Sequence, residues 1–416
     1  MSFPLSFSDS PSSATSSSLA LPDITVTLNA AGDSIFDQAY RHFNQQDTPA
    51  TPHAPVTEPQ EVPDPAPSPY SAPYDQPLER LAQHSQSQNP TAETGSDWAQ
   101  NLNLDHVDVG LLVSEPSLAL AIAVLIEMLI PLPRKIKLGG LSSIFAGLAR
   151  KVNRPSFSAE QRAFAGILLP TLIVAVLLFL VLTLDLIAGF DLIVALVVLV
   201  LVLDLRFAQE RSVQVERALR EGFKDKAKGL LAPMVLRETS MLSELGIAKA
   251  CAESVILRIF SGWFAVMVWF FIAGLEGAVV MQTITILTRE YNYKLRGNAQ
   301  FGKYLFRIQQ IMLALPALAL SVCLFFSKNP LRALACGKEG FNQYPAPISG
   351  FVLGAVGGAL NLSLGGPRYY QGTMVRLPKI GGNNNPIRES ILYAMRKIRM
   401  CGLIMLVLAI LIDLNF

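Results

Sequence analysis

The chain has 416 residues, of which 51% are hydrophobic and 16% are charged, and its mean hydropathy is +0.38. This composition excludes a wholly soluble protein. The formal net charge of +2 conceals two unlike parts. Residues 1–116 contain fifteen acidic and two basic residues, a net charge of −13, whereas residues 117–416 have a net charge of +15. We therefore expect a tail (residues 1–116) followed by the working domain (residues 117–416).

The distribution of histidine and cysteine predicts no metal site. All four histidines lie in the tail, so residues 117–416 offer no histidine ligand and no histidine general base. The cysteines Cys251, Cys323, Cys336 and Cys401 are widely separated and form no CxxC motif, so we interpret them as packing residues.

The tail is rich in Ser, Pro, Gln, Asp and Ala and poor in large apolar residues. Proline at this density opposes helices and sheets, so we expect disorder. The tail has no basic start followed by an apolar segment, so we expect no secretory signal. We also expect that residues 1–110 are dispensable for membrane insertion.

The working domain begins with the apolar segment Leu118–Leu132, which contains Glu127. It is short for a membrane span, so it is either a tilted helix that extends back to Leu111 or an interfacial helix. Residues 134–154 contain six basic residues and no acid. By the positive-inside rule this loop is cytoplasmic.

The longest apolar stretch, Ala163–Leu205, begins with twenty-two uncharged residues, is interrupted at Asp185–Asp191, and then resumes. This pattern predicts a transmembrane helical hairpin, since buried segments of soluble proteins seldom run this far without a charge. The cytoplasmic position of the preceding loop places the hairpin turn outside. Arg206–Lys249, of mixed charge and helical period, should then be a helical cytoplasmic loop.

The next apolar segment, Val255–Leu287, is broken by glycines and by Glu276. Val255–Ala273 is long enough to span alone, but that arrangement would place a basic segment outside. We therefore expect a hairpin or re-entrant pair that turns at the sequence GLEG, residues 274–277.

The remaining segments follow the same logic. Ile308–Phe326 is predicted to span, and the Gly-rich segment Ile348–Leu364 permits close helix contact or a re-entrant loop. Arg368–Arg399 is basic and therefore cytoplasmic, and Cys401–Leu414 is a short last span. The predicted fold is an all-α integral membrane protein: a polytopic helical bundle with a helical cytoplasmic loop and re-entrant or half-span segments.

Two motifs carry a family resemblance. The sequence LRETSMLSELGIAKACAES contains an R-(D/E)-T-x-x-L segment followed by A-x-x-E-S, and LGGPRYYQG begins at Leu364 and ends at Gly372. Residues 117–415 resemble the CobD/CbiB family, the membrane-bound adenosylcobinamide-phosphate synthases of cobalamin biosynthesis. The first 116 residues have no counterpart in that family.

The resemblance implies that a carboxylate of adenosylcobyric acid is joined to aminopropanol or its phosphate, with ATP and Mg²⁺ as cofactors and a corrinoid as substrate. It implies catalytic roles for Glu238 and Glu253. The substrate-binding residues that it implies are Arg237, Thr239, Ser254, Gly365, Gly366, Arg368 and Tyr369. We expect Arg237, Glu238, Glu253 and Arg368 to surround one cavity on the cytoplasmic side.

Each of these residues also has a structural interpretation. Arg237 and Glu238 are equally an ion pair in solvent, and Glu253 is equally a cap or a member of an intraprotein pair. Gly365 and Gly366, with Arg368, suggest a phosphate cradle, but Gly-Gly-Pro also ends helices. Tyr369 either stacks on a corrin or adenine ring or anchors the chain at the membrane interface.

The chain also departs from the family pattern. An E-N-x-x-D-G segment falls on Leu257, Arg258, Ser261 and Gly262, and an N-T-L-D-S-M segment falls on Thr285–Glu290. A later acidic pair falls on Gln309 and Gln310. These losses support a second hypothesis, a catalytically degenerate membrane sensor or scaffold like the modulator of β-lactamase induction. For either function we expect the inner membrane as location and membrane lipids as partners. Other proteins of the cobalamin pathway are further expected partners, and no nucleic acid is expected.

Overall fold

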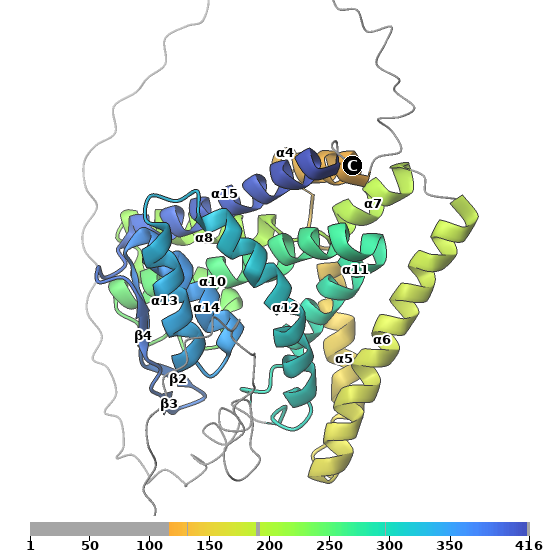
Figure 1. The fold of residues 1–416 in the computed structure, drawn as a ribbon. Helices are drawn as coiled ribbons and strands as arrows, with labels where there is room; N and C mark the ends of the chain where they lie inside the picture. The colour runs from red at the N-terminus through yellow and green to blue at the C-terminus, as the bar shows by residue number, and fades with distance from the viewer. Residues whose placement is uncertain (1–115, 131, 189–191, 296, 414–416) are drawn as a thin grey trace, which may run out of the picture.

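The computed structural model describes residues 116–413 except 131, 189–191 and 296, so residues 1–115 of the predicted tail lie outside the described residues. The described part is a bundle of helices with two small sheets at one side (Figure 1). Its first helices are α4 (Pro116–Leu129), α5 (Ser142–Val152), α6 (Ala159–Ala188), α7 (Leu192–Val202), α8 (Arg206–Arg220) and α9 (Lys224–Leu231). The later ones are α10 (Glu244–Ile259), α11 (Ala265–Glu290), α12 (Lys303–Leu324), α13 (Pro330–Gln343), α14 (Pro347–Leu360) and α15 (Arg388–Asp413).

Four helical stretches in the described residues are long and apolar enough to cross a membrane: Ala159–Leu184, Leu192–Arg220, Glu244–Glu290 and Lys303–Leu324. The fold class predicted from the sequence, an all-α polytopic membrane protein, is therefore confirmed. The predicted last span is instead the second half of the long helix α15, which is not among the four candidates.

The predicted hairpin consists of α6 and α7, and the residues between them, 189–191, lie outside the described ones. The two helices do not pack along each other. α6 packs chiefly against α11 and α12 and stands at the edge of the molecule, whereas α7 packs chiefly against α4 and α11 (Figure 1). Most of the exposed side chains of α6 are apolar, as expected for a surface that faces lipid.

The predicted reversal in the segment Val255–Leu287 lies inside α11. Ala273 and Gly274 leave the helical conformation, with Gly274 at a φ of +60°. A Cβ atom on Gly277 would lie 2.5 Å from the carbonyl oxygen of Trp269. Eight residues of continuous helix would separate these positions by about 12 Å, so the chain turns back on itself here. The expectation of a turn at residues 274–277 is correct to within one residue.

The Gly-rich helix α14 makes close contact with α13, one of the two arrangements expected for it. Gly340 and Gly350 face each other so closely that a Cβ on either would lie 2.2 Å from the carbonyl oxygen of the other. Gly354 lies as close to the carbonyl of Cys336. Small residues let two backbones approach in this way.

The first helix, α4, is too short to span and is anchored by a buried charge. Glu127, 1% exposed, pairs with Lys137 and accepts hydrogen bonds from the backbone N–H groups of Leu205 (3.1 Å) and Arg206 (3.2 Å). Lys137 also donates to the carbonyl of Leu203 at 2.9 Å. The carboxylate thus caps the first turn of α8, whose backbone donors have no partner within the helix.

The segment Arg206–Lys249 is helical, as predicted: α8 and α9 are followed by the short 3₁₀ helix η4 (Ala232–Met234) and the start of α10. Two antiparallel pairs of strands follow α14. They are β1 (Ser363–Gly365) with β4 (Lys379–Gly381), and β2 (Arg368–Tyr370) with β3 (Thr373–Val375). The β2–β3 turn is Gln371–Gly372, both at positive φ, as two-residue hairpin loops require.

Candidate functional site

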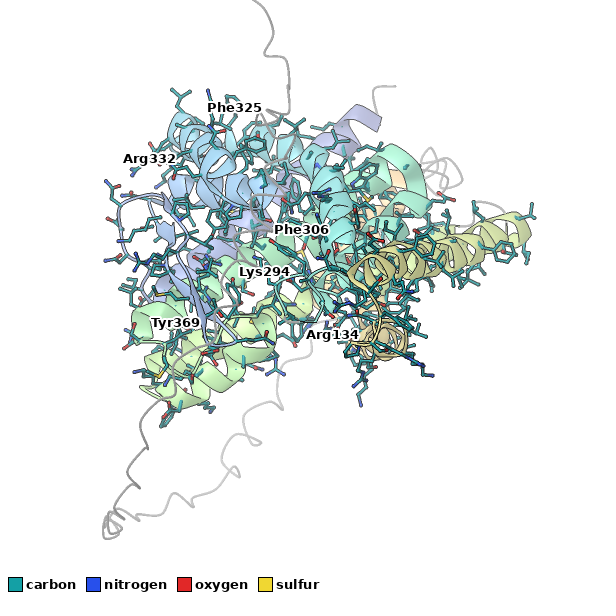
Figure 2. All side chains as sticks on the ribbon, turned by 90° about the horizontal axis from the view of Figure 1, so that it is seen from below. Arg134, Lys294, Phe306, Phe325, Arg332 and Tyr369 are labelled. Atoms are coloured by element: carbon teal, nitrogen blue, oxygen red, sulfur yellow. The ribbon has the colours of Figure 1, made fainter. Side chains whose placement is uncertain are left out.

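A cavity of about 490 Å³ lies between η4, α10, the end of α11, α12, α14 and β2. Its size falls in the range of small-ligand pockets. Six basic side chains and two acidic ones line it: Arg134, Arg237, Arg258, Arg289, Lys294 and Arg368, with Glu253 and Glu290. Figure 2 shows Lys294 near the middle of the molecule when it is seen from below, with Arg134 to one side. The excess of positive charge suits an anionic ligand.

Glu253 is the centre of one wall of the cavity. The residue is 2% exposed, and its Oε2 atom lies 2.5 Å from Nη2 of Arg237 and 3.1 Å from Nη2 of Arg368. Its Oε1 atom accepts a hydrogen bond of 2.6 Å from the backbone N–H of Gly365. Of the two motifs, one supplies Arg237 and Glu253 and the other supplies Gly365 and Arg368, so the fold joins segments 112 residues apart.

Local structure explains how Glu253 and Gly365 meet. The hydroxyl of Ser243 accepts from the N–H of Gly246 and caps α10, which carries Glu253 on its buried face. At the end of β1, Gly365 has a φ of +80°, and a Cβ there would lie 2.2 Å from the carbonyl oxygen of Pro378. Only glycine fits this position, and its N–H is thereby directed at the carboxylate.

The Gly-Gly-Pro segment differs from both interpretations given to it. It does not end a helix, since it connects β1 to β2. Nor does it offer free amides, because Gly365 donates to Glu253 and the N–H of Gly366 donates to the carbonyl of Pro378 at 3.1 Å. A phosphate cradle of these amides would need both hydrogen bonds to open.

The other predicted residues divide between the cavity and its support. Ser254 lines the cavity but donates to the carbonyl of Met234 at 2.8 Å. Glu238 is exposed, does not line the cavity, and accepts from the N–H of Gly372 at 2.5 Å. It therefore holds the β2–β3 hairpin. Arg237 and Glu238 do not pair with each other, since Arg237 contacts Glu253 and Glu238 accepts from Gly372.

Two further predicted residues, Thr239 and Tyr369, also lie outside the cavity lining. The backbone carbonyl of Tyr369 accepts from the N–H of Glu238 at 3.0 Å, while its ring is 48% exposed. Of the four residues expected around one cavity, the structure thus brings together Arg237, Glu253 and Arg368.

Two tyrosines adjoin the second arginine. Nη2 of Arg368 donates to the hydroxyl of Tyr344 at 2.5 Å. Burial raises the pKa of Tyr370, but the positive charges of Lys294 and Arg368 outweigh burial and lower it below its ordinary value. Burial likewise lowers the pKa of Arg368, but the Glu253 carboxylate raises it above the ordinary value, so this guanidinium stays charged. Of the two consecutive tyrosines of the motif, Tyr370 and not Tyr369 therefore lines the cavity.

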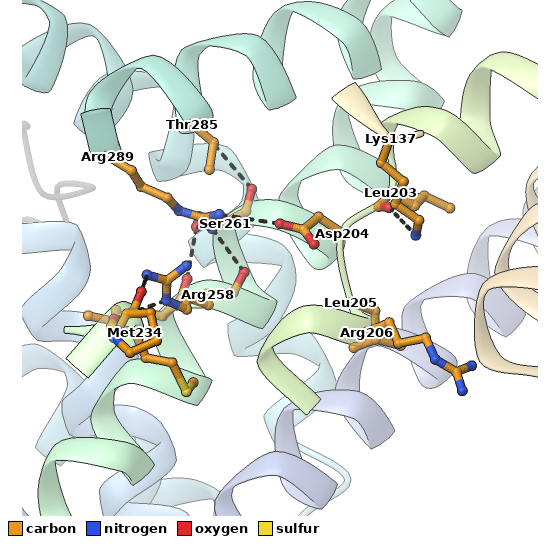
Figure 3. A network of polar contacts seen from close by, with 12 residues as sticks. Lys137, Leu203, Asp204, Leu205, Arg206, Met234, Arg258, Ser261, Thr285 and Arg289 are labelled. Carbon is orange, nitrogen blue, oxygen red and sulfur yellow. Dashed lines mark hydrogen bonds and ion pairs between the residues drawn. The ribbon is translucent and has the colours of Figure 1, made fainter. Parts of the chain in front are cut away.

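A second polar cluster forms another wall, and sequence reasoning assigned it no role (Figure 3). Nη1 of Arg289 lies 3.5 Å from Oδ2 of the buried Asp204, and its Nη2 donates to the hydroxyl of Ser261 at 3.1 Å. Arg258 donates through Nε to the carbonyl of Met234 at 3.1 Å. The available signal was an arginine within each of two apolar helices, since charges there are costly and usually functional.

Comparison with known proteins gives one consistent family. A family model described as "CobD/Cbib protein" matches residues 120–398. Relatives named "Cobalamin biosynthesis protein CobD" include that of Stutzerimonas stutzeri, 31% identical over 212 residues, 51% of this chain and 70% of the relative. That of Chromobacterium violaceum is 29% identical over 206 residues, 50% of this chain and 66% of the relative. That of Streptococcus sanguinis is 28% identical over 179 residues, which are 42% of this chain and 57% of the relative. No solved structure matches.

Proposed function

The chain belongs to the CobD/Cbib protein family, and from that premise we propose that it acts in cobalamin biosynthesis at the inner membrane. The proposed reaction joins a carboxylate of adenosylcobyric acid to aminopropanol or its phosphate, which gives adenosylcobinamide or its phosphate. The observation that carries the proposal is the convergence of Arg237, Glu253 and Arg368 in one cavity.

The electrostatics of the cavity fit an acidic substrate. With both acids ionised, six cations and two anions give the lining a formal charge of +4. A carboxylate or phosphate entering it would exchange water for guanidinium donors, and such charge-assisted hydrogen bonds are about twice as strong as neutral ones. Glu253 fixes Arg237 and Arg368 in position, so little ordering is needed when the anion binds.

The two cofactors implied by the family fit the cavity unequally. Phosphate groups of ATP match the arginines, which bind phosphate bidentately. A Mg²⁺ ion held by the protein alone does not match: among the described residues no three His, Cys, Asp or Glu side chains lie close enough to share a metal ion. Both oxygens of Glu253 already have partners in the protein. We therefore assign no step to a protein-bound metal ion.

The second candidate function, a membrane sensor or scaffold without turnover, has its own support. The carboxylate of Glu253 is fully engaged by two arginines and an amide, and the amides of Gly365 and Gly366 are engaged as well. A site whose polar groups are all paired within the protein stabilises the fold and has none of these groups available for substrate. For either function we propose membrane lipids and other cobalamin-pathway proteins as partners.

Complementation distinguishes the two functions. A strain without the synthase, grown on cobyric acid, would receive the wild-type chain, Glu253→Gln, Arg368→Ala or the control Arg217→Gln, an exposed arginine of α8. The ligase proposal expects growth with the wild type and the control only. Absence of growth with a wild-type chain that is inserted in the membrane would support the scaffold, and growth with Glu253→Gln would exclude the assigned site.

A further inference from the structure

Three arginines from three separate segments meet at the part of the cavity lining that the second polar cluster forms. Arg134 follows α4, Arg258 lies near the end of α10, and Arg289 lies near the end of α11. The guanidinium groups of Arg134 and Arg258 lie 4.2 Å and 5.4 Å from the centre of the Phe207 ring. All three are near enough to repel one another electrostatically. Three cations held this close together in a partly buried site destabilise the folded protein unless an anion binds among them.

The acids of the chain compensate this group only in part. Asp204 contacts Arg289 at 3.5 Å, a distance too long for a strong ion pair, and Glu290 is the one acid of the cavity lining on this side. The Nε atom of Arg134 is buried and has no hydrogen-bond partner. The wall therefore holds more donors than the protein satisfies.

Two of the three guanidinium groups, those of Arg258 and Arg289, are held in position by hydrogen bonds within the protein. Arg258 donates to the carbonyls of Met234 (3.1 Å) and Pro233 (3.2 Å), and Arg289 donates to Ser261. Figure 3 shows Arg258 and Arg289 directed toward each other from facing helices. Fixed guanidinium groups lose little freedom when they bind, which favours planar or tetrahedral oxyanions such as phosphate.

We infer that Arg134, Arg258 and Arg289 form an oxyanion site that binds a phosphate-bearing reactant directly, without a divalent cation held by the protein. In this arrangement the guanidinium groups take the charge-neutralising role that a metal ion has at sites rich in carboxylates. The inference deepens the proposed function, on which it rests, by naming how the same cavity holds phosphate. The phosphate belongs either to a nucleotide or to the phosphorylated amine.

Calorimetry on the full chain in detergent tests this site. Tripolyphosphate and aminopropanol phosphate are the two probes, each measured in EDTA and in Mg²⁺. We expect binding in EDTA with an affinity within about threefold of that in Mg²⁺. The probe that binds more tightly identifies the source of the phosphate. Binding of both probes only in Mg²⁺, or of neither, would overturn the inference.

The matched variants are Asp204→Asn alone and Asp204→Asn with Arg289→Gln, so that removal of the arginine leaves no unpaired acid. We expect the double variant to lose at least about tenfold in affinity, equivalent to 1.4 kcal/mol. Asp204→Asn removes the acid beside Arg289 and should bind the probe at least as tightly as the wild type. The exposed Arg217→Gln is the neutral control and should keep wild-type affinity. If the double variant does not fold, Arg134→Gln, which removes a guanidinium whose buried Nε has no hydrogen-bond partner, should show the same loss. Equal affinity in a folded double variant would contradict the site.

The two proposals fail separately. A chain that binds tripolyphosphate in EDTA but does not restore growth supports the oxyanion site and contradicts the ligase. A chain that restores growth but binds neither probe in EDTA supports the ligase and contradicts the oxyanion site.

Discussion

At the scale of single residues, the site is organised by Glu253, and the sequence predicted its partners only in part. The sequence predicts Arg237 and Arg368 near it because both motifs flank predicted spans at their cytoplasmic ends. The role of Gly365 as a donor to the carboxylate depends on its positive φ, which pattern alone does not reveal. The outward direction of Glu238 was missed because sequence spacing does not fix side-chain direction outside helices and strands.

Replacement of Arg368 tests whether the cavity binds an anionic substrate. Charge-assisted hydrogen bonds contribute roughly 1.5–3 kcal/mol each, so Arg368→Ala should weaken binding of cobyric acid about tenfold or more. Arg368→Lys should recover only part, because an ammonium lacks the planar pair of donors with which a guanidinium binds a carboxylate or phosphate bidentately. Equilibrium binding in nanodiscs gives the three values. If the wild type and both variants bind with equal affinity, Arg368 does not contact the substrate.

The ionisation of Tyr370 tests the electrostatics of the same wall. Because its pKa is lower in the folded chain than its ordinary value of 10.0, the ionised ring stabilises the folded state fully above pH 10. This contribution is lost as the pH falls through the lower folded-state pKa. Stability of the wild type relative to Tyr370→Phe should therefore rise between pH 8 and about 10. A stability difference that is constant or falls would contradict the assignment.

At the scale of elements, the sequence predicted the helices well where apolar runs were long and less well where they were short. The reversal in α11 was expected because a straight span would have put basic residues on the wrong side, and Gly274 supplies the bend. The exact extent of α15 was missed, since its basic first half and apolar second half read as separate segments. The sequence does not predict that α6 and α7 pack against different helices and not along each other. Two uniformly apolar helices have no polar face or charge pattern that indicates which neighbour each will pack against.

The contact of α13 with α14 predicts which glycines are essential. A Cβ on Gly354 would lie 2.2 Å from the carbonyl of Cys336, so Gly354→Ala should destabilise the protein by about 1–3 kcal/mol through overpacking. Gly229→Ala is the control: this glycine of α9 has no neighbour within 4 Å, and alanine there should stabilise by up to about 1 kcal/mol. Thermal unfolding of both variants measures the difference. A neutral Gly354→Ala would show that the helices can separate.

At the scale of the whole molecule, the family, the four candidate spans and the helical loop agree with the sequence, while the orientation in the membrane stays a prediction. It rests on the basic segments 134–154 and 368–399, which the charge rule places in the cytoplasm.

Cysteine labelling of intact cells tests the orientation. A membrane-impermeant maleimide should modify Ala188→Cys, next to the predicted outer turn, and should spare Lys379→Cys in β4. Because Lys379 is exposed in the structure, sparing would come from the membrane and not from burial, and labelling should appear after lysis. The reverse pattern would invert the topology.

The contact between the Glu127 carboxylate and α8 joins residues that are synthesised at different times. Glu127 leaves the ribosome 78 residues before Leu205, which its side chain contacts in the finished protein. At bacterial-type rates of about 5–20 residues per second, roughly 4–16 seconds pass between them. Lys137, ten residues downstream of Glu127, is synthesised within about two seconds of it. The partner that neutralises the acid is therefore available early, whereas the contact of Glu127 with α8 can form only after the whole hairpin has been synthesised.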